Sequence, residues 1–369
     1  MIAYLVVFAA SAATTFIVTP FVRRLVIRIG AIDYPGDRKV HPKPTPTMGG
    51  VAMYVGVLAG LGISRFLPFF AEMNRGSPEP LAVLVTCTLM VGLGAIDDKR
   101  GTSALAKLTA QIFIAGVLIL MGVQLFYFYL PGAAVNLSGG TGVLPTIVWV
   151  ILVANAINLI DGLDGLAAGM VTIAATAFFF YIVHTPSIFG QASAAALISA
   201  ITAGVCVGFL PWNFNPAKIF MGDSGSMLLG MLLVIATISG VGRNPLPPTG
   251  RDLAVLAIPV FLPLAVLAVP FLDVVLAVVR RLWRGQGIGH ADSLHIHHRM
   301  MDLGHSHRQA VLLLYLWSIL ISGSALALGL VQSRFAVGVI IIGAALLFLI
   351  TALPRLGGRG RGGPLQNPL

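Results

Sequence analysis

Charged residues and cysteines are both scarce in this chain of 369 residues. Only 10% of the residues are charged, against roughly a quarter in an average soluble domain. The mean hydropathy is +0.94, and 57% of the residues are hydrophobic. These values exclude a soluble globular protein and predict a polytopic membrane protein. The two cysteines, Cys87 and Cys206, fall within apolar runs, so we expect neither a disulfide nor a cysteine metal site.

Several common catalytic and targeting motifs are also missing. The sequence contains no HExxH zinc motif and no recognisable nucleophilic serine or cysteine motif. The N-terminus has no basic leader and no small-residue cleavage site. We therefore interpret the first apolar run as a transmembrane helix and not as a removed signal peptide.

Apolar runs long enough to cross a hydrocarbon core of about 30 Å recur along almost the whole chain. They lie near residues 2–22, 48–70, 80–96, 105–123, 143–160, 165–184, 191–210, 225–242, 253–279, 309–332 and 335–353. The pattern predicts an all-α polytopic membrane protein with about 11 transmembrane helices. We expect one integral membrane domain over residues 1–353 and a disordered, basic, Gly-rich tail over residues 354–369.

Basic residues are concentrated in alternate loops. Of the 23 lysines and arginines, 18 fall on one side of the predicted membrane. The positive-inside rule assigns that side to the cytoplasm, so the N-terminus is expected outside and the C-terminus in the cytoplasm. The same distribution accounts for most of the net charge of +10, and no nucleic-acid partner is inferred.

Most acidic residues lie on the same side of the predicted membrane as the basic residues. Ten of the 13 aspartates and glutamates lie on or near the predicted cytoplasmic face. Acidic residues contribute little to membrane orientation, so their concentration needs another cause. We interpret it as a binding or catalytic cleft on the cytoplasmic face.

The stretch NAINLIDGLDGLAAG, residues 155–169, places polar side chains between apolar runs. Asp161 and Asp164 share a face if the stretch is helical, and such a pair suggests a cation site. The alternative is a loop at a helix end, in which the aspartates cap the next helix and the glycines make the turn. The sequence does not distinguish these two structures.

Asp97 and Asp98 stand together at the end of the third predicted span. A carboxylate at a helix C-terminus opposes the helix dipole, so this pair requires a cation or a basic partner. Lys107, at the start of the next span, could supply that charge or contact a phosphate. Alternatively, Lys107 extends to the membrane interface without a partner.

Two further loops carry candidate binding groups. Asp223, flanked by glycines in FNPAKIFMGDSGS, is either a helix N-cap or a carboxylate that a bulky anion and its metal can approach. The last polar loop contains six histidines with arginines beside them, and we favour phosphate binding over zinc for it. The six are His290, His295, His297, His298, His305 and His307.

Together these groups indicate a reaction type. Aspartates, a lysine, arginines and histidines at headgroup depth suit phosphoryl-type transfer between a cytosolic phosphate compound and a lipid, with Mg²⁺ neutralising developing charge. A transporter is the main rival. Transporter sites usually lie near the membrane midplane on broken helices, whereas these residues lie at helix ends.

Four stretches carry a resemblance to a known family: AIDDKRGTSALAKLTAQ, NAINLIDGLDGLAAG, FNPAKIFMGDSGS and HIHHRMMDLGHSHRQAV. In this order and on one membrane face, they resemble the polyprenyl-phosphate N-acetylhexosamine-1-phosphate transferases of the WecA/TagO type. The resemblance extends from DRKVHPKPTPTMGG in the first loop to the tenth span. It implies a bacterial cytoplasmic-membrane enzyme in which undecaprenyl phosphate attacks a UDP-N-acetylhexosamine. UMP is released, and the enzyme uses Mg²⁺ or Mn²⁺.

The resemblance also implies roles for individual residues. Asp97, Asp98 and Asp223 match catalytic positions, with one of the adjacent pair as base for the lipid phosphate. Asp223 and Asn158 match metal ligands. The remaining matches are substrate-binding positions, namely Lys107, Asn155, Asp161, Asp164, His295, His297, His298 and Arg299.

One departure bears on the donor. The related phospho-N-acetylmuramoyl-pentapeptide transferases usually show acidic and aromatic residues after the histidine run, whereas Arg299 follows His298 here. The difference favours UDP-N-acetylglucosamine as donor, with the pentapeptide transferase as the alternative. Members of the family are often dimers, so a homodimer is possible.

Overall fold

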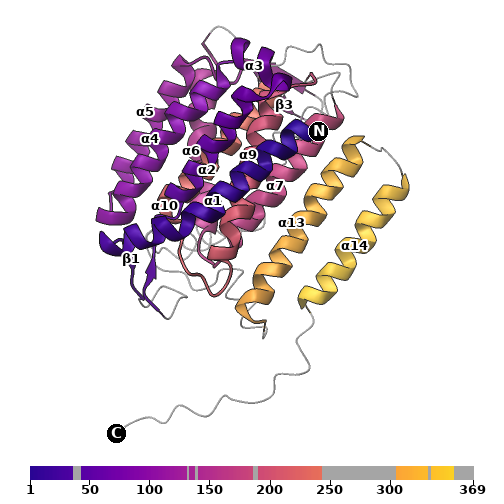
Figure 1. Ribbon diagram of the computed structural model, residues 1–369. Helices are drawn as coiled ribbons and strands as arrows, with labels where there is room; N and C mark the ends of the chain where they lie inside the picture. Colours follow the sequence, from indigo (N-terminus) through magenta and orange to yellow (C-terminus); the bar gives the residue numbers. More distant parts are fainter. Residues whose placement is uncertain are drawn as a thin grey trace, which may run out of the picture.

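The computed structural model describes residues 1–35, 43–130, 133–137, 140–185, 190–242, 305–330 and 334–352. This part of the chain is α-helical apart from short helical turns and two small antiparallel hairpins (Figure 1). Its α-helices are α1 (Ile2–Arg28), α2 (Gly50–Phe66), α3 (Ala71–Gly76), α4 (Glu79–Arg100), α5 (Ala104–Leu120), α6 (Val143–Ile160), α7 (Leu166–His184), α9 (Ala194–Asn213), α10 (Gly222–Thr237), α13 (His307–Leu330) and α14 (Arg334–Ala352). The hairpins are β1 (Ile32–Asp33) with β2 (Thr45–Pro46), and β3 (Tyr127–Leu130) with β4 (Ala133–Asn136).

Seven of the described helices are long and apolar enough to cross a membrane, or eight if the bent pair formed by α2 and the following turns counts as one span. The helices at Ala104–Leu120 and Val337–Thr351 are apolar but shorter. The protein is therefore polytopic, as predicted. The full count of 11 spans stays a prediction, because the ninth run, 253–279, lies outside the described residues together with the tail, 354–369.

Several predicted span boundaries were wrong. The first run, 2–22, continues as helix α1 to Arg28. The run 48–70 is not one straight span, because the chain bends by 89° between α2 and the segment Pro68–Gly76. Leu67 precedes a proline and adopts an extended conformation, with ψ at 119°, which ends the helix. The run 80–96 is longer than predicted, and α4 contains Asp97 and Asp98 in its last turns. The run 225–242 begins earlier, at Gly222, and ends in a π-helical turn, Ile238–Gly242.

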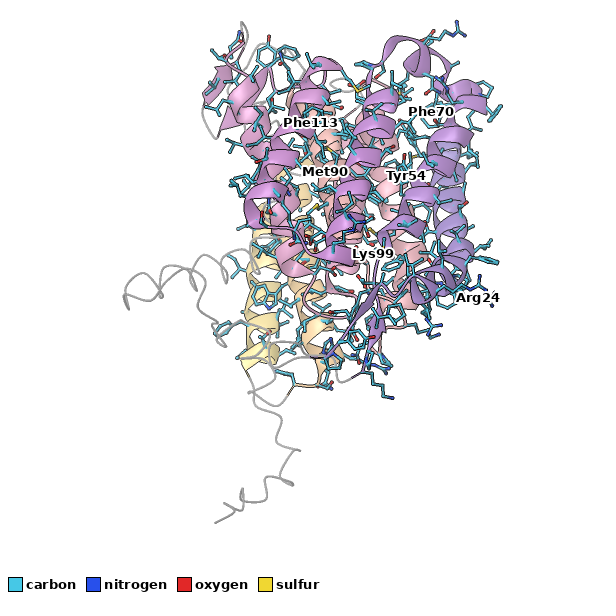
Figure 2. The ribbon with its side chains drawn as sticks, turned by 90° about the vertical axis from the view of Figure 1, so that its left-hand side faces the viewer. Arg24, Tyr54, Phe70, Met90, Lys99 and Phe113 are labelled. Carbon is cyan, nitrogen blue, oxygen red and sulfur yellow. The ribbon has the colours of Figure 1, made fainter. Side chains whose placement is uncertain are left out.

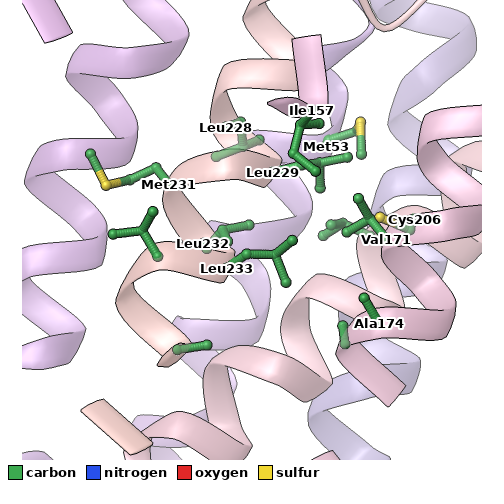
Figure 3. Close-up of a cluster of buried hydrophobic side chains, with 14 of the residues drawn as sticks. Met53, Ile157, Val171, Ala174, Cys206, Leu228, Leu229, Met231, Leu232 and Leu233 are labelled. Carbon is green, nitrogen blue, oxygen red and sulfur yellow. The ribbon is translucent and has the colours of Figure 1, made fainter. Parts of the chain in front are cut away.

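Helix α10 lies at the centre of the bundle and packs against α2, α4, α6 and α9. Every residue from Ser224 to Thr237 is buried, as expected for a helix that is apolar on all sides. Figure 3 shows its leucines and Met231 among side chains of the surrounding helices, including Met53, Ile157 and Cys206. Both cysteines are free and buried, which confirms the sequence interpretation.

The two ends of the bundle differ in the side chains that they carry. Figure 2 shows Arg24 and Lys99 at one end and Phe70 at the opposite end. The first hairpin lies at the basic end, next to the C-terminus of α1 (Figure 1). Helices α13 and α14 form a pair at the edge of the bundle, where α13 packs against α7 (Figure 1). The helix ends that carry Asp97 and Asp223 also lie at this end.

Candidate active site

Four helices bring their polar ends together at the basic end of the bundle. The end of α4 supplies Asp97, the first turn of α5 supplies Lys107, the last turn of α6 supplies Asn158, and the first turn of α10 supplies Asp223. Consecutive spans run in opposite directions, so a C-terminus of one helix meets the N-terminus of the next. The structure therefore joins three of the stretches that the sequence singled out.

Lys107 connects two of the carboxylates. Its Nζ atom lies 2.5 Å from Asp97 Oδ2 and 2.5 Å from Asp223 Oδ2. The three side chains are largely shielded, with exposed fractions of 24% for Lys107, 12% for Asp97 and 21% for Asp223. The expectation that the adjacent aspartates need a basic partner is confirmed for Asp97. Lys107 does not extend to the interface alone.

Asp223 points away from the N-terminus of its own helix. The N-cap of α10 is Met221, and no side chain of that position caps the helix, so the N-cap interpretation of Asp223 was wrong. Instead, the Asn158 amide donates from Nδ2 to Asp223 Oδ1 at 2.7 Å and to Ser226 Oγ at 3.0 Å. Asn158 and Lys107 thus hold the two oxygens of Asp223 from opposite sides.

The two adjacent aspartates have different environments. Asp97 Oδ1 accepts the backbone N–H of Thr102 at 2.7 Å and also the Thr102 hydroxyl. Asp98 turns toward α10, and its two oxygens accept the backbone N–H groups of Asp223 and Ser224 at 2.8 and 3.1 Å. Only Asp97 of the pair shares a cation with Asp223.

The stretch 161–165 is a turn and not a helix. Helix α6 ends at Ile160 and α7 begins at Leu166, so the shared helical face was wrong and the loop interpretation was right. Gly165 has φ at +81°, a conformation that glycine adopts without strain. Capping of α7 by an aspartate was wrong as well, since its N-cap is Gly165.

Asp164 holds the segment that leads to α10. Its Oδ2 atom accepts the Asn215 amide at 2.9 Å and the Ala217 backbone N–H at 3.0 Å. Asn213 strengthens the same junction by accepting the Gly165 N–H at 3.1 Å and donating to the Ile219 carbonyl at 3.1 Å. These contacts give Asp164 a structural role.

The side chain of Asp161, unlike that of Asp164, has no hydrogen bond or ion pair with any described residue, and its backbone N–H bonds the Asn158 carbonyl at 3.3 Å. Burial raises the pKa of its carboxyl well above the usual range, and the negative charges of Asp98, Asp223 and Asp164 raise the pKa further. A carboxylate in this position is stabilised by a cation. Asp161 is therefore a carboxylate of the site that lacks a partner among the described residues and that a bound cation would stabilise.

Asn155 lies one helical turn before Asn158 and deeper in the bundle. Its amide donates from Nδ2 to Gln111 Oε1 at 2.8 Å and to the Ile151 carbonyl at 2.7 Å. The structure thus places Asn155 between α5 and α6. It lies beside the cluster formed by Asp97, Lys107, Asn158 and Asp223 and not within it. The predicted substrate contact of Asn155 stays a prediction.

The predicted histidine site lies outside the described residues, and this applies to His295, His297, His298 and Arg299. Helix α13 is bonded to the segments on either side of the Asp164 contact, namely the turn 161–165 and residue Asn215. Arg308 donates from Nε to the Asn215 carbonyl at 2.8 Å, and the Tyr315 hydroxyl donates to the Gly165 carbonyl.

Sequence reasoning missed several residues that complete the cluster. They are Thr47, Thr102, Asn213, Asn215, Ser226, Arg308 and Tyr315. Thr102 had a detectable signal, because a hydroxyl just past a helix end commonly bonds a carboxylate in the last turn. The others act through contacts between distant parts of the chain, for which a single sequence carries no signal.

The donor set fits a small, hard divalent cation. Among the described residues, no three histidine, cysteine, aspartate or glutamate side chains converge as a ready metal cage. Asp97 and Asp223 nevertheless converge on one ammonium group, with the Asn158 amide beside them. Mg²⁺ binds proteins through one or two carboxylates and completes its shell with water and substrate phosphates. The cluster is therefore adequate for Mg²⁺ without a closed cage.

Comparison with known proteins identifies the family. Residues 80–241, which contain Asp97, Lys107, Asn158 and Asp223, match the family model described as Glycosyl transferase family 4. The decaprenyl-phosphate N-acetylglucosaminephosphotransferase of Mycolicibacterium smegmatis is 41% identical over 357 residues, which cover 94% of this chain and 87% of that protein. The chain belongs to glycosyl transferase family 4. The predicted resemblance is confirmed, and the protein is a polytopic membrane transferase, which removes the transporter alternative.

Two further relatives differ in how much of the chain they match. A probable undecaprenyl-phosphate N-acetylglucosaminyl 1-phosphate transferase of Bacillus subtilis is 35% identical over 357 residues, covering 96% of this chain and 93% of that protein. The phospho-N-acetylmuramoyl-pentapeptide-transferase of Mycolicibacterium smegmatis is 34% identical over 287 residues, covering 66% of this chain and 77% of that protein. The likeness to the first type of transferase extends over more of the chain.

Proposed function

We propose that the protein transfers N-acetylglucosamine-1-phosphate from UDP-N-acetylglucosamine to a polyprenyl phosphate, releasing UMP and starting the synthesis of a lipid-linked envelope glycan. The relatives that match nearly the whole chain carry this activity in their names. The observation that carries the proposal is the convergence of Asp97 and Asp223 on Lys107 Nζ at the basic end of the bundle. A lipid phosphate at the membrane surface and a soluble nucleotide sugar can meet there.

The reaction transfers the sugar-bearing phosphoryl group from UMP to the lipid phosphate. An oxygen of the lipid phosphate attacks the phosphorus that bears the sugar, a new P–O bond forms, and the bond from that phosphorus to the oxygen of UMP breaks. A divalent cation supplies neutralisation of the charge that develops on the phosphate oxygens. Asp223 and Asn158 are the proposed ligands for Mg²⁺ or Mn²⁺, because their side chains lie beside one another.

Asp97 is the member of the adjacent pair that we assign to the lipid phosphate. Thr102 fixes one of its oxygens, and the other faces Lys107. A phosphate monoester has a second pKa of about 6, so much of the lipid phosphate is dianionic at neutral pH. Asp97 therefore acts mainly by orienting that group, while Lys107 attracts the donor diphosphate.

The remaining predicted site residues are assigned to substrate binding. Asp161 is proposed for the nucleotide and metal side of the cleft, since its carboxylate has no partner among the described residues. Asn155 and Asp164 support this side of the cleft through their neighbours. The histidine loop, with His295, His297, His298 and Arg299, is proposed to close over the phosphates.

The phospho-N-acetylmuramoyl-pentapeptide donor is the second candidate. The relative with that name matches only 66% of the chain, whereas the N-acetylglucosamine phosphotransferase matches 94%. Arg299 after the histidine run favours the smaller donor as well. The proposed acceptor is undecaprenyl phosphate, and decaprenyl phosphate is the natural competitor because it gives one relative its name.

A donor and acceptor panel tests the proposal. The purified protein in detergent is supplied with Mg²⁺, one of the two UDP-linked donors, and either undecaprenyl or decaprenyl phosphate, and UMP release is measured. We expect release with UDP-N-acetylglucosamine that depends on the lipid phosphate. Release with the pentapeptide donor alone would replace the proposed donor, and no release with any combination would refute the transfer reaction.

Asp223→Asn tests the metal assignment. We expect kcat for UMP release to fall at least about 100-fold, the usual cost of removing a group that stabilises developing charge. Additional Mg²⁺ does not restore the rate, because the charged ligand itself is missing. Glu72→Gln changes an exposed carboxylate in α3, at the other end of the bundle, and serves as the control with unchanged kcat. Normal turnover of Asp223→Asn would remove Asp223 from the metal site.

A further inference from the structure

Asp98 is bound to protein donors through both carboxylate oxygens. Oδ1 accepts the backbone N–H of Asp223 at 2.8 Å and the Thr47 hydroxyl at 3.4 Å, and Oδ2 accepts the backbone N–H of Ser224 at 3.1 Å. Asp97, the preceding residue, bonds instead to Lys107 and Thr102. The two neighbours are therefore built into the site in different ways.

Helix α10 has no side-chain cap of its own. Its N-cap residue, Met221, makes no side-chain hydrogen bond, and the Gly225 N–H is bonded to the Met221 carbonyl at 3.2 Å. The first N–H groups of a helix have no partner within that helix, and the N-terminus carries a partial positive charge. Asp98 supplies from α4 the acceptor and the negative charge that an N-cap residue normally supplies locally.

Glycines bring α4 and α10 close enough for a short side chain to reach. A Cβ atom at Gly222 would meet both carboxylate oxygens of Asp98 and the Thr47 hydroxyl, and Gly222 has φ at +69°. A Cβ atom at Gly94 would meet the backbone of Ser224. The contact is thus fitted to an aspartate on α4 and leaves no space for a longer residue.

The cap acts on the residue that the proposed function needs most. Asp98 fixes the backbone N–H of Asp223, and from this fixed point the Asp223 side chain extends to Lys107 and Asn158. We propose that Asp98 is a positioning residue, which caps α10 and so orients Asp223. The inference rests on the proposed role of Asp223.

Hydrogen exchange measures the cap directly. The full-length protein in detergent is compared with Asp98→Asn, Thr47→Val and Asp97→Asn by mass spectrometry of peptides that contain Asp223 and Ser224. The side-chain amide of the Asp98→Asn variant offers one oxygen and turns an NH₂ group toward a backbone donor. We expect these two backbone amides to exchange about tenfold faster in Asp98→Asn, the effect of losing a helix cap. Thr47→Val gives a smaller increase, and Asp97→Asn gives none at these amides.

Metal binding and kinetics measure the consequence. In Asp98→Asn, Mn²⁺ binding followed by electron paramagnetic resonance weakens, and the Mg²⁺ concentration for half-maximal UMP release rises by about tenfold. The KM values for both substrates stay within about twofold, because no substrate contact is lost.

The outcomes separate the cap from the proposed reaction. Unchanged exchange at Asp223 and Ser224 in Asp98→Asn overturns the inference, and so does faster exchange with unchanged Mn²⁺ binding. If Asp98→Asn does not fold, Thr47→Val tests the same hydrogen-bond group with a milder change. If the wild-type protein releases no UMP, the proposed function fails, but exchange and Mn²⁺ binding still decide the role of Asp98.

Discussion

Neighbouring carboxylates in this site meet their need for a positive partner in different ways. Asp97 has the Lys107 ammonium, Asp98 has the N-terminus of α10, and Asp164 has an amide and a backbone N–H in the segment before α10. Asp161 has no such partner among the described residues. A shielded carboxylate without a partner costs stability, and its proposed place on the nucleotide and metal side of the cleft would account for that cost.

The contrast between Asp161 and Asp164 gives a prediction on stability. The raised pKa of Asp161 means that the folded state holds its proton more tightly than the unfolded chain does. Ionised Asp161 therefore destabilises the folded protein. This destabilisation is absent below the unfolded-state pKa of about 4, and it grows as the pH rises toward the folded-state pKa. We expect Asp161→Asn to raise the melting temperature at neutral pH and to reduce its decline with pH. Thermal unfolding in detergent across this pH range measures both.

Asp164→Asn is the matched control, three residues away in the same turn. It exchanges a carboxylate that accepts two hydrogen bonds for an amide that accepts them less well, so we expect a loss of about 2 kcal/mol and a lower melting temperature. Equal effects of Asp161→Asn and Asp164→Asn would show that the two carboxylates are held alike, contrary to the structure.

At the scale of elements, glycines determine how closely the helices approach. A Cβ atom at Gly50 would meet the backbone of Gly225 in α10, and a Cβ atom at Gly169 would meet the Tyr315 ring of α13. The second contact allows the Tyr315 hydroxyl to bond the Gly165 carbonyl in the turn before α7. Helix α13 begins at His307, within the last part of the predicted histidine loop, and this contact joins α13 to the turn before α7.

Gly169→Ala tests that helix contact. The added methyl group displaces the Tyr315 ring, and we expect a loss of about 1 to 3 kcal/mol, the usual cost of overpacking a close contact. Gly116→Ala in α5 is the control, because a methyl group added there meets no atom of the described residues within 4 Å and alanine favours the helix. Thermal unfolding of the two variants measures the difference. A destabilisation of Gly116→Ala equal to that of Gly169→Ala would contradict the packing argument.

At the scale of the whole molecule, one end of the bundle collects the basic residues and the cluster. The exposed Lys99 and Arg24 lie at this end, together with the termini of α4, α5, α6 and α10 that form the site (Figure 2). From the charge asymmetry we propose that this end faces the cytoplasm, where a UDP-sugar is available. The orientation and the cytoplasmic-membrane location are part of our proposal.

Cysteine labelling tests the orientation. Lys99→Cys and Arg75→Cys place thiols at exposed positions on opposite ends of the bundle, and the native Cys87 and Cys206 are buried and give little background. A membrane-impermeant maleimide is expected to label Arg75→Cys in intact cells and Lys99→Cys only in inverted vesicles. The reverse pattern would place the N-terminus in the cytoplasm.

Sequence alone determined the class of protein, the set of polar helix ends and the family. Hydropathy over some twenty residues reports a membrane span because the bilayer has a fixed thickness, and family motifs are contiguous. The need of Asp97 and Asp98 for positive partners was also readable, since the helix dipole is a local property.

Only the tertiary structure decided which partner each carboxylate has. Asp98 and Asp223 are separated by 125 positions in the chain, and Lys107 and Asp223 by 116, so no local pattern links them. Which helices surround α10 is likewise not readable from its own residues, because α2, α4, α6 and α9 come from distant parts of the chain. Residue types determined which chemistry is possible, and packing between distant helices determined which residue performs each part.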